Sequence, residues 1–350
     1  MQQVMISNIS MRSIAIALPE KTEFNYELSD VLDYEEIERL SQRIGIYSRR
    51  VAEDDITAFD LMYQAVENLL KNTYLKKEDI DCIVCITQTP DYLIPGNSFL
   101  LCHKLGLKAS IFTLDINAGC AGFTHGLIVL GRLINNGDMK CGLLVVGDTL
   151  TRLVNPKDKT ERLLFGDGAA ACVLEFDQKG KGLTACWRTI ADDYDKLIVP
   201  AGGMRKPNTE ETNITNLRKN GIYRSENNLA MDGAAVFSFS IQEVPDIVNF
   251  ALRSCNLSSD DIDLFIFHQA NKFMVDSIRT KLKISAEKVP IFVEGIGNTS
   301  CASIPIAISR YALNQGINKI SGRLCLTGFG TGLSLSSIII EVEDLIVTSL

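Results

Sequence analysis

The sequence predicts an α/β fold built from two duplicated halves, and three observations support this prediction. Residues 75–85 and 257–267 each contain a turn, an acidic pair, an Ile-Asp step and an apolar strand, at an offset of 182 residues. Residues 117–121 likewise resemble residues 298–302, at an offset of 181 residues. Strand-length apolar runs alternate with helical patterns in both parts of the chain. A repeat of this length is too long for a solenoid, so the two halves are expected to share one topology.

The composition excludes several classes of protein. The 350 residues, 46% of them hydrophobic, are enough to bury a large core. A net charge of −8 without a long basic run argues against binding to nucleic acid. The start of the chain lacks the pattern of a signal peptide, and the apolar runs are far shorter than a membrane span. Ten dispersed cysteines are typical of reduced thiols, so we expect a cytoplasmic protein with no membrane span.

The two halves are expected to join at residues 178–182, which are polar and rich in glycine. We therefore predict an N-terminal half over residues 1–178 and a C-terminal half over residues 179–350. Residues 202–228 are polar and aperiodic, and they predict a long loop in the second half. Loops of this length in compact domains are usually functional covers or disordered segments.

Each half contains a strand or helix pattern on either side of its small-residue loop. In the first half, residues 110–115 predict a strand, a helix should end near Gly137, and residues 142–147 predict the next strand. In the second half, a helix should end near Gly316 and a strand should follow over residues 323–327. These units place the small-residue loops at helix starts, where catalytic groups gather in α/β proteins.

Cys120 is the first candidate for chemistry, because it lies at a helix start between Gly119 and Gly122. Free N–H groups and the positive end of the helix dipole favour a thiolate there. The glycines allow backbone or substrate to approach closely. The alternative is a buried packing cysteine, and Cys301, at the equivalent place in the second half, is the natural competitor.

Of the three histidines, His268 is the best candidate, because it ends an apolar strand and begins a polar run. His103 lies in a helical pattern, and His125 lies on the helix after Cys120, about 140° round from it. Asn298 offers fixed, uncharged N–H donors for a developing oxyanion. The alternatives are a structural histidine at His268 and an Asx turn or N-cap at Asn298.

The sequence indicates neither a metal nor a phosphate site. Cys82 and Cys85 have CxxC spacing, but residues three apart on a strand point to opposite faces and cannot hold a metal together. Residues 165–169 and 328–332 are rich in glycine without the pattern of a phosphate loop, so they predict tight turns near the site. No metal and no cofactor are therefore expected.

The ordered set of motifs resembles β-ketoacyl-acyl carrier protein synthase III, a condensing enzyme of the thiolase-like superfamily. The resemblance covers nearly the whole chain. Its motifs are the Cys120 loop and residues 43–51, 164–169, 231–237, 268–271, 297–300 and 328–332. It implies a duplicated thiolase-like fold with five αβαβα layers and two halves related by a pseudo-twofold axis.

The resemblance also implies roles for the site residues. Cys120 is expected to be the acylated nucleophile and Cys301 its inert counterpart, while His268 and Asn298 hold the malonyl thioester carbonyl. The backbone N–H groups of Cys120 and Thr331 are expected to form the oxyanion hole. The family usually has glycine at the Thr331 position, but the contact comes from the main chain.

The implied activity is an acyl transfer without a cofactor. An acyl primer on Cys120 would undergo decarboxylative Claisen condensation with a malonyl thioester, as in the initiation of fatty-acid or related acyl-chain synthesis. The implied partners are an acyl-coenzyme A or acyl-carrier-protein donor, malonyl carrier protein, and a second copy of the chain in a homodimer. The expected substrate-binding residues are Arg43, Arg152, Asn271 and Phe329. Two alternatives stay open: acyl transfer to an alcohol or amine, and a non-catalytic partner subunit.

Two departures from the family pattern predict a specialised member. Arg39 stands where the family commonly has a tryptophan that stacks on the adenine of coenzyme A, and the one tryptophan of the chain is Trp187. Arg152 matches the second adenine-stacking residue. Phe273 replaces a basic residue that helps to dock the carrier protein. Both primer delivery and carrier contact are therefore expected to differ from those of the usual enzyme.

Overall fold

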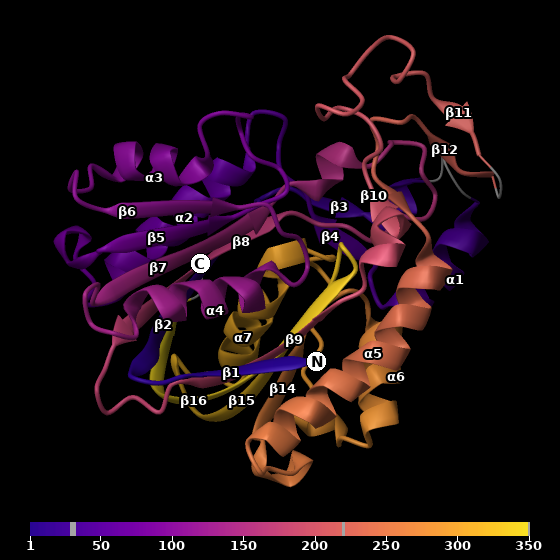
Figure 1. Cartoon of the computed structure of the whole chain (residues 1–350). Helices are drawn as coiled ribbons and strands as arrows, with labels where there is room; N and C mark the ends of the chain where they lie inside the picture. The colour runs from indigo at the N-terminus through magenta and orange to yellow at the C-terminus, as the bar shows by residue number, and fades with distance from the viewer. Residues whose placement is uncertain (29–32, 219–220, 349–350) are drawn as a thin grey trace.

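The chain folds into alternating layers of helices and strands, as Figure 1 shows. The computed structural model describes residues 1–28, 33–218 and 221–348. Its α-helices are α1 (Tyr34–Ile44), α2 (Ala58–Asn72), α3 (Asn97–Leu105), α4 (Gly122–Ile134), α5 (Gly233–Ser254), α6 (Lys272–Leu282) and α7 (Ser303–Asn314). The strands of the main sheet are β1 (Gln2–Ile6), β2 (Ile9–Ala17), β5 (Cys82–Ile86), β6 (Phe112–Ile116), β7 (Cys141–Asp148), β8 (Gly168–Phe176), β9 (Leu183–Thr189), β14 (Leu264–Phe267), β15 (Lys319–Gly330) and β16 (Ser334–Thr348).

The two halves repeat one strand order, which confirms the predicted duplicated α/β fold. In the first half the neighbours run β5-β7-β8-β2, and in the second half they run β14-β15-β16-β9. The first pair of each series is parallel and the following two pairs are antiparallel. Parallel pairing between β16 and β2 joins the two series into a single sheet. The first strand of the chain, β1, pairs with β9 at the edge of the second series.

Three helical layers cover these strands. The helices α2 and α3 pack on one outer side, and α5 and α6 pack on the other. Between the two series of strands lie α4 and α7, and each contacts strands of both series. The largest apolar cluster fills this middle layer, where Phe123 and Leu127 of α4 and Ile304 and Ile308 of α7 are buried. This αβαβα arrangement places the starts of α4 and α7 close together at the centre of the molecule.

The repeated sequence pattern produces the same local structure twice. A 3₁₀ turn precedes each buried strand, over Lys77–Asp79 before β5 and over Ser259–Asp261 before β14. In each turn an aspartate accepts a hydrogen bond from the backbone N–H three residues earlier. Both Cys82 and Cys85 are buried within β5, so the predicted strand is confirmed there.

The predicted loop over residues 202–228 contains short strands in its described part. The strands β11 (Asn216–Leu217) and β12 (Tyr223–Arg224) form a hairpin that extends beyond the layers (Figure 1). Flanking strands β10 (Leu197–Ile198) and β13 (Ala230–Met231) pair with each other. A third short pair joins β3 (Thr22–Phe24) to β4 (Ser48–Arg50). Within the described residues, no helix is both long enough and apolar enough to cross a membrane.

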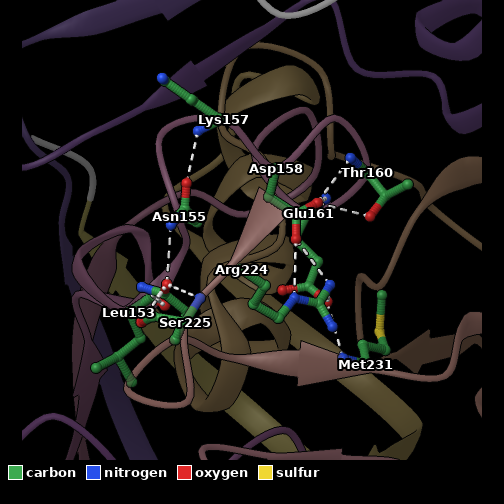
Figure 2. A network of polar contacts seen from close by, with 10 residues as sticks. Leu153, Asn155, Lys157, Asp158, Thr160, Glu161, Arg224, Ser225 and Met231 are labelled. Atoms are coloured by element: carbon green, nitrogen blue, oxygen red, sulfur yellow. Dashed lines mark hydrogen bonds and ion pairs between the residues drawn. The ribbon is translucent and has the colours of Figure 1, made fainter. Parts of the chain in front are cut away.

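A buried network of polar contacts ties this hairpin to the body of the protein (Figure 2). The Nη2 atom of Arg224 lies 2.7 Å from Oδ2 of Asp158 and 2.7 Å from Oε1 of Glu161. The same Glu161 oxygen accepts a hydrogen bond from the Met231 N–H at 2.8 Å. Burial raises the pKa of Glu161 to about 8, although Arg224 acts in the opposite direction. A polar residue of the segment 202–228, Arg224, therefore holds the hairpin against Asp158 and Glu161.

Candidate active site

Cys120 lies in the short connection between the end of β6 and the start of α4, as the sequence predicts. Its side chain is buried, and glycines lie close both to this cysteine and to Cys301. A Cβ atom on Gly330 would lie 2.9 Å from the Cys120 sulfur, and one on Gly122 would lie 3.0 Å from Cβ of Cys301. Because real Cβ atoms rarely approach so closely, the Cys120 thiol requires glycine at position 330, and the packing of Cys301 beneath α4 requires glycine at position 122.

The ionisation state of Cys120 differs from the expectation drawn from its helix start. Burial raises the pKa of this thiol to about 12, and the carboxyl of Asp148 adds to the effect. The hydroxyl of Ser300 and the backbone groups of Cys120 and Thr331 act in the opposite direction. Desolvation therefore outweighs the helix terminus, and the thiol is protonated in the free site.

His268 directly follows β14, as predicted, and its ring is neutral. Burial lowers the pKa of this imidazole to about 3. Its Nδ1 atom lies 2.7 Å from Oγ of Ser303, and that hydroxyl oxygen accepts a hydrogen bond from the Gln269 N–H at 3.3 Å. The hydroxyl proton is therefore available to Nδ1, and this pattern assigns the ring proton to Nε2.

The side chain of Asn298 forms an Asx turn through its oxygen and, in the part of the chain that the structure describes, keeps its N–H donors free of the protein, so both interpretations of its sequence position apply. Its Oδ1 atom accepts a hydrogen bond from the Ser300 N–H at 3.0 Å, which is an Asx turn. Within the described residues its side-chain nitrogen makes no protein hydrogen bond. Its backbone is held by Leu164 and Gly166 across the β-bridge to Phe165. The turn uses the amide oxygen and leaves the N–H donors for a ligand.

These three side chains line one cavity of about 490 Å³. Arg43, Asn271 and Phe329, which the sequence predicts to bind substrate, line it as well. The guanidinium of Arg43 lies 4.7 Å from the centre of the Phe273 ring. Cys120 also lines a second cavity of about 330 Å³ with Thr331 and several apolar side chains. The apolar residues of the second cavity are Leu150, Leu153, Phe165, Leu197, Ile198, Val199 and Leu229.

Arg152 lies outside both of these cavities. Its Nη2 atom donates hydrogen bonds to the backbone carbonyls of Glu53, Asp54 and Ile56, at 3.0, 2.7 and 2.8 Å. Arg39 is on the surface of α1, with its side chain 74% exposed. Neither arginine therefore contacts the three central side chains, and Arg152 is already engaged by the protein itself.

Cys301 also lines neither cavity, although it lies at the equivalent place in the second half. Its sulfur lies 3.3 Å from Oδ2 of Asp148 and 3.7 Å from the carbonyl oxygen of Ile86, and its single proton can be donated to either oxygen. Burial raises the pKa of this thiol well above its usual range, and Asp148 adds to the effect. A thiol in this setting packs beneath the site.

Three residues near the site were not predicted from the sequence: Asp148, Ser300 and Ser303. Asp148 ends the apolar strand β7, and a carboxyl at the end of a buried strand is a signal that sequence reasoning can use. Ser300 lies within a recognised motif, but nothing local to the sequence connects it with Asp148. Ser303 contacts His268 across 35 residues, which no local pattern indicates.

A cysteine, a histidine and an asparagine on facing loops of duplicated α/β halves define a condensing enzyme of thiolase-like fold. Residues 114–189 match the family model of 3-oxoacyl-[acyl-carrier-protein] synthase III, and residues 252–342 match the model of its C-terminal part. The β-ketoacyl-[acyl-carrier-protein] synthase III of Fusobacterium nucleatum subsp. nucleatum is 35% identical over 338 residues, which are 96% of this chain and 99% of that protein.

Solved structures agree with the sequence relatives. The 3-oxoacyl-(acyl-carrier protein) synthase from Burkholderia xenovorans LB400 is similar with a TM-score of 0.91 and 32% identity, covering 100% of this chain and 99% of that one. The priming β-ketosynthase of the R1128 polyketide pathway has a TM-score of 0.82 and 26% identity over 96% of each chain. The chain belongs to the 3-oxoacyl-acyl carrier protein synthase III family and is an acyltransferase.

Proposed function

We propose that this enzyme condenses an acyl primer carried on Cys120 with a malonyl thioester, with loss of CO2, at the start of fatty-acid or related acyl-chain synthesis. The observation that carries the proposal is the position of the thiol, which lines both cavities. His268 and Asn298 share the first cavity with the thiol, and apolar side chains surround it in the second. An acyl chain in the second cavity would leave the first free for the malonyl group.

Acyl loading requires donors around the oxygen of the tetrahedral intermediate. The backbone groups of Cys120 and Thr331 interact with the thiol and lower its pKa, which supports their role as the oxyanion hole. The hydroxyl of Thr331 is directed toward Oε1 of Gln88, at 3.4 Å. A threonine here is therefore compatible with a contact that uses only the main chain.

Decarboxylation requires donors that do not carry a full charge. Loss of CO2 from the malonyl group leaves an enolate, and His268 and Asn298 each supply an uncharged N–H toward the first cavity. Because the departing CO2 leaves the carbanion behind, no strong base is needed. The enolate carbon then attacks the thioester carbonyl on Cys120, and the cysteine leaves as a thiolate.

The substrates are an acyl thioester as donor and a malonyl carrier protein as acceptor. Arg39 is exposed and Arg152 is held by three backbone carbonyls, so the usual adenine stack has no preformed partner at either position. At the first cavity, Phe273 stacks on Phe237 with ring centres 5.3 Å apart, and Arg43 covers it. This apolar rim supports a donor held by its phosphopantetheine arm more than by adenine.

A cytoplasmic homodimer completes the proposal. All ten cysteines are free, which fits a reducing compartment. The strand β6 ends the order of the main sheet, and Phe112 on it is 42% exposed. An unpaired edge strand with an exposed aromatic side chain favours pairing with a second copy. Size-exclusion chromatography with light scattering tests this, and a monomer at micromolar concentration would contradict it.

The nucleophile is tested with Cys120→Ala, and Cys301→Ala serves as the matched control. Intact-protein mass spectrometry after incubation with a panel of acyl thioesters should detect an adduct in the wild type and in Cys301→Ala, and none in Cys120→Ala. Adding a malonyl thioester should then release CO2 and remove the adduct. An adduct on Cys301 refutes the assignment, and discharge of the adduct only by an alcohol or amine would show the alternative reaction. A wild type that forms no adduct would show a non-catalytic partner subunit.

A further inference from the structure

The second cavity, in which the proposed function places the primer, is not lined by hydrocarbon alone. Gln88 and Thr331 line it together with Cys120, and most of the remaining lining is apolar. Asn117 and Tyr194 also line it, but both of these side chains are exposed. A purely hydrocarbon primer would cover the polar groups of Gln88 and Thr331 without giving them a hydrogen-bond partner, which is unfavourable.

The backbone of Gln88 is fixed by the strand that follows it in the sheet. Gln88 comes directly after β5, and its N–H donates a hydrogen bond to Oδ1 of Asp148 at 2.6 Å. The Thr87 hydroxyl donates to the same oxygen at 2.9 Å. Asp148 is fully buried at the end of β7, which pairs with β5 in parallel. The Gln88 side chain therefore extends from a rigid part of the fold.

The amide of Gln88 and the hydroxyl of Thr331 meet beside the nucleophile. The Thr331 hydroxyl donates to Oε1 of Gln88 at 3.4 Å. A Cβ atom on Gly119 would collide with this Oε1 and lie 2.7 Å from Oγ1 of Thr331. Gly119 directly precedes Cys120, so both polar side chains lie against the loop that carries the thiol.

The contact between Thr331 and Gln88 leaves hydrogen-bonding capacity for a ligand. Among the residues that the structure describes, the side-chain N–H groups of Gln88 have no protein acceptor. Oγ1 of Thr331 uses its proton on Gln88 and keeps its lone pairs. A ligand hydroxyl both accepts and donates, so it matches this pair, whereas a ketone can only accept from the amide. An ionised substituent does not fit, because no described lysine, arginine or histidine lines the cavity.

We propose that Gln88 determines the specificity of the primer site and selects an acyl group that carries an uncharged hydroxyl on its second or third carbon. The Gln88 amide donates to this hydroxyl, and the hydroxyl donates to Oγ1 of Thr331. The substituent lies near the thioester because both side chains lie beside the Cys120 loop. The hydroxyl forms no covalent bond. The Cys120 sulfur bonds to the acyl carbon, the bond from that carbon to the donor sulfur breaks, and the donor leaves as a thiol with the Cys120 proton.

The inference rests on the proposed acylation of Cys120, and single-turnover loading tests the two separately. The donors are pantetheine thioesters of butyryl, succinyl and both enantiomers of 2- and 3-hydroxybutyryl groups, and the adduct is followed by intact-protein mass spectrometry. The best hydroxybutyryl donor should load the wild type at least about tenfold faster than butyryl, the discrimination that one or two hydrogen bonds provide. The charged succinyl group should load more slowly than butyryl.

Three variants relate this preference to the side chain. Gln88→Met keeps the length of the side chain and removes the amide. It should load butyryl at least as fast as the wild type does, with the best hydroxybutyryl donor within about threefold of butyryl. Thr331→Val keeps the backbone N–H and should lower the same ratio of rates. Gln315→Met makes the matched exchange at the exposed end of α7 and should leave both rates within about threefold of the wild type.

Loading of butyryl at least as fast as every hydroxybutyryl donor in the wild type overturns the inference alone, and this result requires no variant. An unchanged ratio in Gln88→Met also overturns it, as does an equal loss with both donors in a variant that keeps the wild-type unfolding temperature. If Gln88→Met does not fold, an unchanged ratio in Thr331→Val overturns the inference instead. A wild type that forms no Cys120 adduct with any donor overturns the inference and the proposed function together.

Discussion

Replacing Ser303 with alanine should slow decarboxylation and leave acyl loading intact. The Ser303 hydroxyl lies 2.7 Å from Nδ1 of His268 and assigns the ring proton to Nε2. Without it, a tautomer with the proton on Nδ1 becomes competitive, and that tautomer cannot donate to an enolate oxygen from Nε2. A net hydrogen bond is worth about 0.5–1.5 kcal/mol, which corresponds to a loss of roughly 2- to 13-fold in the productive tautomer.

Removing the side chain of His268 or Asn298 should slow decarboxylation much more than removing the Ser303 hydroxyl, which only sets the tautomer of His268. His268→Ala and Asn298→Ala should each lower the rate of decarboxylation by about 100- to 1000-fold, as the loss of an oxyanion donor does. Both should still acylate at Cys120. The assay compares CO2 release from a malonyl thioester with adduct formation followed by mass spectrometry, in the same preparations.

The pH dependence of decarboxylation provides an independent check that the His268 ring is neutral. Because burial lowers the pKa of His268 to about 3, decarboxylation should show no titration of this residue between pH 5 and 8. A rate change near pH 6.5 that disappears in His268→Gln would refute the reasoning. So would a loss in Ser303→Ala as large as that in His268→Ala, or an equal loss of acyl loading.

Three further predictions concern packing, stability and donor choice. Gly330→Ala should abolish acyl loading, since the new Cβ would lie 2.9 Å from the Cys120 sulfur, whereas Gly203→Ala, with open space around it, should load normally. The folded state raises the pKa of Glu161 from 4.5 to about 8, so the stability from this group is complete below pH 4.5 and is lost as the pH rises through 8. Thermal unfolding temperature should therefore fall across that range in the wild type and fall less in Glu161→Gln, and identical slopes would contradict this. Free acyl-coenzyme A should be a weaker donor to Cys120 than the same acyl group on a carrier protein; a preference for coenzyme A that is lost in Arg39→Ala would show that the arginine replaces the usual tryptophan.

The fold was predictable because the duplication preserved local patterns that each half needs for itself. The aspartates Asp79 and Asp261 close the same turn before a buried strand, so the repeat is visible in the sequence without any long-range information. Cys120 and His268 were identifiable for a related reason, because one begins a helix and the other ends a strand. Their roles in catalysis remain predictions.

The remaining features of the site depend on contacts between distant segments. The protonated state of Cys120 follows from burial, which its helix start does not reveal. The contact between Cys301 and Asp148 joins the two halves and has no local signature. The hydrogen bonds of Arg152 to the backbone of residues 53–56 likewise depend on a loop almost 100 residues away in the sequence.

The pairing of β1 with β9 and of β16 with β2 has a consequence for synthesis on the ribosome. The strand β1 must wait for a partner about 180 residues later, and β2 gains one of its neighbours only when residues 346–348 have been made. Contacts this distant in sequence form slowly and leave strand edges open meanwhile. Neither half can therefore finish its sheet alone, so each leaves strand edges open until the other half has been made.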